Sequence, residues 1–141
     1  MLIKQLSVFL ENKKGRFTEI ARILGEAGVN MTAFTVAENS DFGILRLIVS
    51  DAEKAKEVLK SHRYAVNSTD VLCVECPNRP GALASVMTII TDADIFIEYM
   101  YAFSNGNKAL VILRPNDLEK TVEVLSQNQV ELLAINDLFR L

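Results

Sequence analysis

The segment whose residue types could do chemistry runs from Cys76 to Leu83. Asn78 can both donate and accept hydrogen bonds. Pro80 fits the first position of a helix, where a missing N–H costs nothing, and Gly81 lets another group approach the backbone closely. A helix that begins here offers N–H groups and a partial positive charge, which suit a carboxylate. The segment could therefore hold the charged groups of an amino acid, but taken alone it is more typical of an ordinary helix-entry turn.

Cys73 and Cys76 have the spacing of a C-x-x-C motif. Redox and metal-carrying pairs need both thiols on one side, usually across a loop-to-helix junction. In a strand, positions three apart point to opposite faces, so we interpret this spacing as accidental. Two cysteines so close together also cannot form a disulfide framework.

The single histidine, His62, lies beside Lys60 and Arg63 near the end of a predicted helix. A solvated cation is expected at such a position. A lone histidine lacks the nucleophile and the acid that acyl transfer requires. We therefore predict no catalytic residue, no metal ligand and no cofactor, and we do not expect an enzyme.

The elements that position these residues form an internal repeat. An ungapped offset of 66 residues, the separation of Gly15 and Gly81, aligns the two halves. Such self-similarity predicts one architecture used twice, over residues 1–69 and 70–141. The join near Asp70 lies inside a strand-like run without a flexible linker, so we expect rigidly adjoined units. Identical pairs include Leu6/Leu72, Val8/Val74, Asn12/Asn78, Ile23/Ile89, Asp51/Asp117 and Leu59/Leu125.

Hydrophobic periodicity changes in a definite order within the first unit. Alternation predicts strands, and 3.6-residue spacing predicts helices. Asp51 is expected to cap the second helix, as is Asp117 in the second unit. Hairpin turns are expected at Asn39–Asp41 and at Asn105–Asn107. The expected elements are strands over residues 3–10, 29–38, 42–50 and a last strand through 67, with helices over 17–27 and 52–61.

The order βαββαβ, used twice, predicts an α+β protein. We expect two ferredoxin-like units packed side by side, each an antiparallel sheet with helices on one face. A unit of about 70 residues buries roughly 60% of its unfolded surface and is marginal alone, so the units should pack together. Leu45 and Leu47 should face the helices, whereas Ile44 and Ile48 alternate with them. Because helices cover only one face, a second copy of the chain is the simplest cover for the other, and we expect a homodimer.

Composition excludes several classes of function. The 141 residues are half hydrophobic and carry a formal net charge of −3. This charge gives no electrostatic footprint for nucleic acid or an anionic membrane. No apolar run reaches the roughly 20 residues of a membrane span, and none resembles a secretory signal, so we predict a cytoplasmic location.

The element order, the loop Asn78-Arg79-Pro80-Gly81-Ala82-Leu83 and the element Gly28-Val29-Asn30 resemble the ACT domain family of amino-acid-sensing modules. The likeness covers essentially the whole chain. Residues 7–17 and 28–31 are similar in particular to the opening of acetolactate synthase regulatory subunits, whereas the second half departs from them as a further ACT-like unit.

The resemblance implies where a ligand binds. In this family one module supplies the loop after its first strand, and its neighbour supplies the asparagine near the start of its second strand. We therefore expect one good site and one degenerate site. The good site takes Asn78, Arg79, Pro80, Gly81, Ala82 and Leu83 with Asn30, Met31 and, at the strand end, Cys76. The degenerate site takes Asn12, Lys13, Lys14, Gly15, Arg16 and Phe17 with Phe96.

The resemblance also implies a function, although a fold alone does not fix one. We expect a regulatory protein that binds a free amino acid and signals to a separate enzyme or transporter. The alternative is a constitutive dimerising subunit whose ligand site is vestigial. RNA-binding modules of similar shape need exposed strand aromatics and a basic surface, and the sequence has neither their motif nor their charge.

Overall fold

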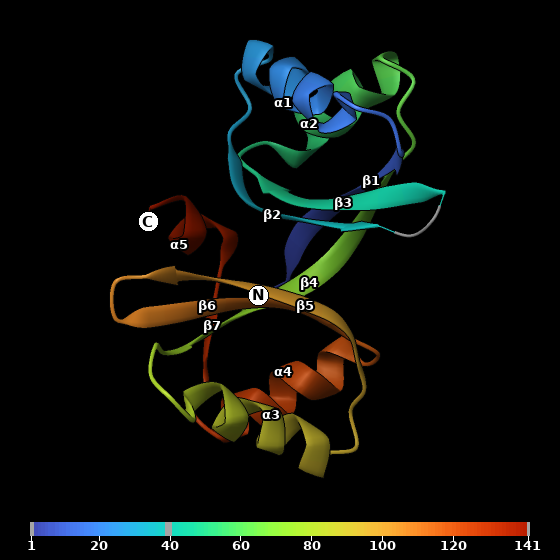
Figure 1. Cartoon of the computed structure of the whole chain (residues 1–141). Coiled ribbons are helices and arrows are strands. Elements are labelled where there is room, and N and C mark those ends of the chain that lie inside the picture. The colour runs from blue at the N-terminus through green and yellow to red at the C-terminus, as the bar shows by residue number, and fades with distance from the viewer. Residues whose placement is uncertain (1, 39–40, 141) are drawn as a thin grey trace. The chain divides into compact units, whose positions relative to one another are not determined.

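The structure, a computed structural model, describes residues 2–38 and 41–140. The chain divides into two compact units. Residues 4–69 form the N-terminal unit, and residues 70–140, with residues 2 and 3, form the C-terminal unit. Strand β4 (Val66–Pro77) begins in the first and continues into the second (Figure 1).

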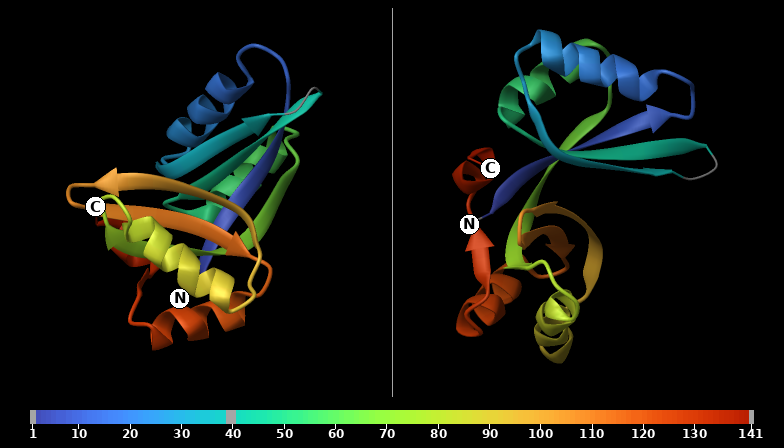
Figure 2. Two further views of the ribbon diagram at one scale, coloured as in Figure 1. Left: turned by 60° about the horizontal axis from the view of Figure 1, so that its bottom comes forward. Right: turned by 60° about the vertical axis from the view of Figure 1, so that its left-hand side comes forward.

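The N-terminal unit is an antiparallel sheet with helices on one face (Figures 1 and 2). Its strand order is β2-β3-β1-β4. Side chains that alternate along the strands form a core with the helices, as the spacing of Leu45, Leu47 and Val49 predicts. Besides β4, its elements are β1 (Ile3–Glu11), α1 (Arg16–Glu26), β2 (Met31–Glu38), β3 (Phe42–Val49) and α2 (Ala52–Ser61).

The C-terminal unit repeats this arrangement, with strand order β7-β4-β6-β5. The prediction of βαββαβ used twice, with helices on one face of an antiparallel sheet, is confirmed. A short final helix, α5, follows the repeat and was not predicted, because its five residues carry no clear helical period. The elements after β4 are α3 (Ala82–Asp92), β5 (Ile97–Asn105), β6 (Lys108–Pro115), α4 (Leu118–Gln127), β7 (Glu131–Leu133) and α5 (Ile135–Phe139).

The helix caps and one of the two hairpin turns form where the sequence predicts them. The Asp51 carboxylate accepts a hydrogen bond from the Lys54 N–H at 3.1 Å, and Asp117 does the same with Lys120 at 3.0 Å. Both predicted helix caps are thus confirmed. The turn between β5 and β6 is also confirmed, since Asn105 pairs with Lys108 across it. The predicted turn at residues 39–41 lies partly outside the described residues.

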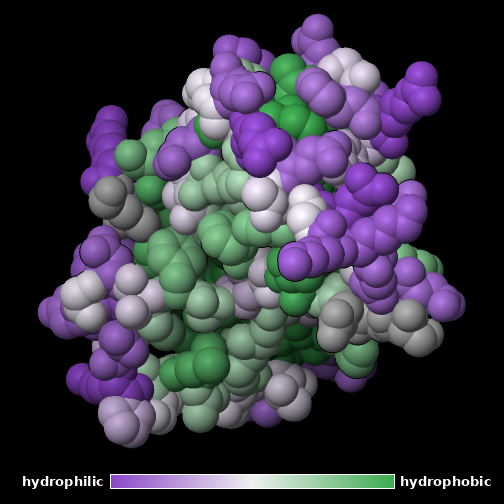
Figure 3. Space-filling view, turned by 45° about the horizontal axis from the view of Figure 1, so that its top comes forward, coloured by the Kyte–Doolittle hydropathy of each residue, from purple (hydrophilic) through white to green (hydrophobic). Residues whose placement is uncertain are grey.

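The helix-free faces need less cover than the sequence suggested. Ile48, Leu110 and Ile112 are already buried in the chain itself, each with no more than 1% of its surface exposed. These three residues therefore do not require a second copy, whereas Ile44, which was predicted to lie on the same face as Ile48, is only partly buried. Phe9 and Phe42 are about two-fifths exposed, and their rings form an edge-on pair with centroids 6.3 Å apart. Apolar side chains are visible on the face of the molecule in Figure 3.

Within the described residues, no helix has the length and apolar character needed to cross a membrane.

Candidate functional site

The loop before the first helix has the same geometry in both units. Gly15 and Gly81 are the N-caps of α1 and α3, and both have φ of 87°. This left-handed conformation is easy for glycine and strained for other residues. A Cβ added at either glycine meets no atom within 4 Å. The dihedral angle, and not close approach by another part of the chain, is therefore what these positions require.

Pro80 does not occupy the first helical position. Helix α3 begins at Ala82 after its N-cap Gly81, so Pro80 precedes the cap. The expectation that Pro80 starts the helix was wrong. Pro80 lies inside a turn over residues 79–82, in which the Ala82 N–H donates to the Arg79 carbonyl at 3.2 Å. In the N-terminal unit the Arg16 N–H donates to the Lys13 carbonyl at 3.4 Å. The equivalent turn forms with Lys14 in the place of Pro80.

The first helix of each unit lacks the cap that the second helix has. The N-caps Gly15 of α1 and Gly81 of α3 make no side-chain cap hydrogen bond, whereas Asp51 and Asp117 cap α2 and α4. The first N–H groups of a helix have no partner within it and carry partial positive charge. Both loop–helix junctions can therefore accept a carboxylate from outside the chain.

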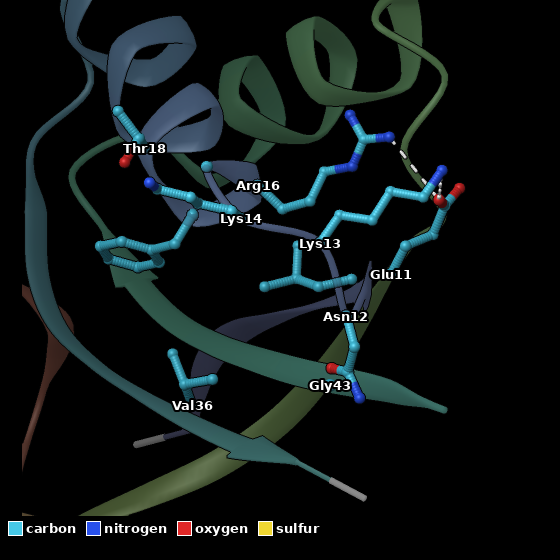
Figure 4. Close-up of a pocket in the computed structure, with 11 residues that line it drawn as sticks. Glu11, Asn12, Lys13, Lys14, Arg16, Thr18, Val36 and Gly43 are labelled. Carbon is cyan, nitrogen blue, oxygen red and sulfur yellow. Dashed lines mark ion pairs between the residues drawn. The ribbon is translucent and has the colours of Figure 1, made fainter. Parts of the chain in front are cut away.

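A pocket of about 420 Å³ lies at the junction in the N-terminal unit (Figure 4). Sequence reasoning assigned residues 12–17 to the degenerate site and missed the other lining residues, which are Leu10, Glu11, Thr18, Val36 and Gly43. Val36 could have been suspected from the apolar alternation of β2, but only the β2–β3 pairing brings it to the loop. The pocket is lined by Leu10, Glu11, Asn12, Lys13, Lys14, Gly15, Arg16, Phe17, Thr18, Val36 and Gly43.

Charge around this pocket is partly compensated. Glu11 forms ion pairs with Lys13 at 2.9 Å and with Arg16 at 3.6 Å (Figure 4). The hydrogen bond and charge of Lys13, aided by Arg16, hold the pKa of the Glu11 carboxyl below its usual value. Arg16 also lies 3.5 Å from Glu19. Lys14, by contrast, forms no ion pair with a carboxylate of the described residues. Among these residues, its ammonium group is therefore an uncompensated positive charge next to the N-terminus of α1.

An apolar wall lies beside the same junction. The rings of Phe17 on α1 and Phe34 on β2 are stacked at a tilt, with centroids 5.6 Å apart. Phe34 and Val36 are each about half exposed. The junction thus combines N–H groups and a cation with an apolar wall, which is the combination that an amino acid with an apolar portion requires.

The loop of the C-terminal unit is exposed from Asn78 to Gly81. It is tied to the β5–β6 turn, because the Asn78 N–H donates to the Asn107 carbonyl at 2.8 Å. Leu83, in the first turn of α3, is two-fifths exposed. Cys76 is 6% exposed and belongs to the core beneath the helices, although it also lines a pocket with Pro77 and Lys108.

The predicted partners of these loops lie at equivalent positions. Asn30 directly precedes β2 and Phe96 directly precedes β5; both side chains are exposed, Phe96 by 67%. Met31 begins β2 and is partly buried. Asn30 belongs to the N-terminal unit and the loop Asn78–Leu83 to the C-terminal unit, so their combination in one site stays a prediction.

The two cysteines are buried, and the single histidine contacts the end of its own helix. Cys76 lies in the helix-side core and Cys73 does not, and both are free and buried. Burial, aided by the charge of Glu75, raises the pKa of the Cys73 thiol to about 12. His62 Nδ1 lies 2.9 Å from the Val58 carbonyl at the end of α2. Over residues 2–38 and 41–140, no group of three or more histidine, cysteine or acidic residues is placed to hold a metal ion.

Comparison with known proteins places these observations in a family. A family model described as an ACT domain pair matches residues 1–141. Among solved structures, protein BT0572 from Bacteroides thetaiotaomicron is 52% identical and has a TM-score of 0.96, over 100% of this chain and 98% of that one.

More distant structures share the fold. The regulatory subunit of aspartate kinase from Thermus thermophilus is 14% identical with a TM-score of 0.64, over 88% of this chain and 90% of that one. The Thermus flavus subunit is 14% identical with a TM-score of 0.63, over 90% and 93% of the two chains. No curated protein matches the sequence significantly.

Proposed function

Because the chain belongs to the family of ACT domain pairs, we propose that it is a non-catalytic regulatory protein that binds a free amino acid and signals to a separate enzyme or transporter. The observation that carries this proposal is the contrast between helix ends. In both units the helix that follows the first strand is left without a side-chain cap, while the next helix is capped by aspartate. A helix N-terminus without a side-chain cap, present in both units, suits a carboxylate ligand.

The ligand's two charged groups would meet different parts of the site. The α-carboxylate accepts hydrogen bonds from the N–H groups at the start of the helix. The α-ammonium donates to amide or carbonyl oxygens, such as those of Asn78 and Asn30. We assign the principal site to the loop Asn78–Leu83 with Asn30, and a second site to residues 12–17 with Phe96.

Signalling requires that the ligand discriminate between two states of the protein. A ligand that binds one packing arrangement more tightly shifts the population toward it, by no more than its difference in affinity for the two. A partner protein that recognises one arrangement then responds to the concentration of the amino acid. Ligand-dependent change in hydrogen exchange or X-ray scattering is the expected signature.

A thermal-shift screen of the purified protein against the twenty amino acids tests the proposal. A ligand present at 100 times its dissociation constant adds about 2.7 kcal/mol to the free energy of unfolding. For a chain of this size, that corresponds to a rise in Tm of several degrees. We expect one amino acid, or a small group of similar ones, to give this shift.

Two asparagine variants then separate the sites. Asn78→Ala removes the loop side chain of the principal site and should abolish the shift, whereas Asn12→Ala, at the equivalent position, should retain it. Equal losses from the two changes would contradict the assignment of one principal site. A flat screen with a folded wild-type protein would exclude amino-acid sensing altogether.

Exposed apolar side chains favour a second candidate function. Phe9, Phe34, Val36 and Phe42 each expose two-fifths or more of their surface. Such side chains are typical of contacts with another protein molecule. A protein that dimerises whether or not an amino acid is present would be a constitutive interaction subunit, and sedimentation with and without the twenty amino acids separates this candidate from the first.

A further inference from the structure

The start of the second strand is held by the same two hydrogen bonds in both units. The Asn30 N–H donates to Ser50 Oγ, and the Ser50 N–H donates to the Asn30 carbonyl, both at 2.9 Å. In the C-terminal unit, the Phe96 N–H donates to Asn116 Oδ1 at 3.1 Å and the Asn116 N–H donates to the Phe96 carbonyl at 2.9 Å. We call these reciprocal pairs the Ser50 clasp and the Asn116 clasp.

Each clasp is anchored on its other side by a capped helix. Ser50 lies between the end of β3 and Asp51, whose carboxylate caps α2. Asn116 lies between the end of β6 and Asp117, whose carboxylate caps α4. The clasp residue is therefore restrained by the strand before it and the helix after it, so it is a rigid support for residue 30 or 96.

A strand irregularity follows each clasp at the equivalent place. The register of β2 against β3 shifts between Met31 and Ala33, and that of β5 against β6 shifts between Ile97 and Tyr99. A bulge re-aims the side chains beside it and is frequent near functional sites. The clasp and the bulge together fix how residue 30 or 96 is presented.

The backbone geometry is kept while the side chains change. Serine forms the clasp in one unit and asparagine in the other, so the common requirement is an oxygen that accepts from the backbone N–H. The presented residue changes from Asn30, with an amide, to Phe96, with an exposed ring. The same backbone arrangement therefore carries an amide side chain at residue 30 and an aromatic side chain at residue 96.

We propose that Ser50 is a positioning residue of the amino-acid site, which fixes the backbone of Asn30 so that the Asn30 side chain is aimed at the ligand. This inference rests on the proposed function and on the predicted ligand contact of Asn30. Ser50 itself does not touch the ligand. Asn116 positions Phe96 in the same way for the second site.

The expected cost of losing the clasp appears mainly in binding. Ser50 and Asn30 are both exposed, so water can replace Oγ as the acceptor when Ser50 is truncated. Folding stability should change little. The Ser50 N–H still donates to the Asn30 carbonyl, but the Asn30 N–H loses its fixed acceptor, so the Asn30 side chain is held less firmly. Loss of one well-placed hydrogen bond corresponds to roughly a fivefold increase in Kd.

The test measures Kd by calorimetry for the amino acid that gives the largest shift in the thermal screen. Ser50→Ala should raise Kd about fivefold, and Ser50→Asn should restore it, because asparagine forms the clasp in the C-terminal unit. Ser61→Ala is the matched control. Ser61 Oγ also makes a side-chain-to-backbone hydrogen bond in the same unit, to the Val58 carbonyl at 2.7 Å, but far from residue 30 in sequence.

A double-mutant cycle separates positioning from a merely structural role. If Ser50 acts through the Asn30 side chain, Ser50→Ala has no further effect on Kd in the Asn30→Ala protein. Additive losses would overturn the proposal, as would wild-type affinity in Ser50→Ala or no rescue by Ser50→Asn. Should circular dichroism show that Ser50→Ala is unfolded, Ser50→Cys, with a weak acceptor, takes its place in the cycle.

The failures of the two proposals are distinguishable. If no amino acid stabilises or binds the wild-type protein, the proposed function is wrong, and the role of Ser50 falls with it. If the wild type binds and Ser50→Ala binds equally well, only the positioning role is wrong. A larger loss from Asn116→Ala than from Ser50→Ala would move the principal site to Phe96 and overturn the role assigned to Ser50.

Discussion

Gly15 and Gly81 show how one backbone angle shapes the candidate site. Each has φ of 87° and ends the loop at the point where the first helix starts. The loop before them differs in composition, with Lys14 in one unit and Pro80 in the other, yet the turn that precedes the helix is the same. The glycine is therefore the residue on which the shape of the junction depends.

Gly81→Ala should lower the free energy of unfolding by roughly 1 to 2 kcal/mol, because alanine is strained at this φ. Gly25→Ala is the matched control. Gly25 lies within α1, has no positive φ and has no atom within 4 Å of an added Cβ, so alanine should stabilise the protein by about 0.5 to 1 kcal/mol. Urea unfolding measures both; a neutral Gly81→Ala would contradict the strain argument.

The cysteines should be inert in the folded protein. Cys73 has a pKa of about 12 and is buried, so near neutral pH almost none of it is thiolate. Cys76 is buried in the helix-side core. We expect Ellman's reagent to titrate two thiols in denaturant and to react very slowly without it. Fast reaction of the folded protein, or formation of an internal disulfide, would show that the C-x-x-C spacing is functional.

At the scale of elements, the two helices of each unit have different roles at their N-termini. The first begins at a glycine that makes no side-chain cap hydrogen bond, and the second is capped by an aspartate directly after the clasp residue. This division is made by short-range sequence. A glycine in a left-handed conformation supplies no oxygen, whereas the aspartate carboxylate reaches the N–H three residues on.

Asp51→Ala should therefore cost about 1 kcal/mol of folding stability, since the Lys54 N–H loses its acceptor. Asp51→Asn should restore most of this, because the asparagine oxygen caps as well as that of aspartate. Glu57→Ala, on the exposed part of the same helix, is the control and should lie within about 0.5 kcal/mol of wild type. Equal effects at Asp51 and Glu57 in urea unfolding would refute the cap.

At the scale of the whole molecule, exposed aromatic side chains favour self-association. Phe9 and Phe42 form an edge-on pair on the strands of the N-terminal unit and remain about two-fifths exposed. The sequence argument for a homodimer used the apolar residues that alternate with those facing the helices. Of these, Ile48, Leu110 and Ile112 are buried in the chain itself, and Ile44 is partly buried. The argument for a dimer therefore moves to the exposed aromatic pair.

We expect wild-type protein to sediment as a species of twice the chain mass. Phe9→Lys should shift it to the monomer, because a charge placed at an apolar contact costs more than the contact gains. Glu57→Lys, on the exposed face of α2, is the control and should leave the dimer intact. A monomeric wild-type protein would refute the homodimer, and a dimeric, folded Phe9→Lys would locate the contact elsewhere.

The sequence by itself determined the order of the elements, the caps at Asp51 and Asp117 and the repeat at 66 residues. These depend on interactions between residues close in the chain, or on a periodicity that the chain carries along its length. The positions of the loop glycines, Gly15 and Gly81, could also be predicted from the sequence. Their positive φ could not. The open approach to the backbone that was expected at Gly81 stays a prediction for a ligand, whereas the structure shows the positive φ and no chain atom within 4 Å of an added Cβ.

Only the tertiary structure decided which distant residues come together. Val36 reaches the pocket through β2–β3 pairing, and Ser50 holds Asn30 across 20 residues of chain. Strand alternation says that Ile48 and Ile112 point away from the helices, but not that they are buried. Burial and pocket lining depend on which segments pack against one another. A local sequence pattern predicts on which face of a strand a residue lies, but not which distant residues cover that face.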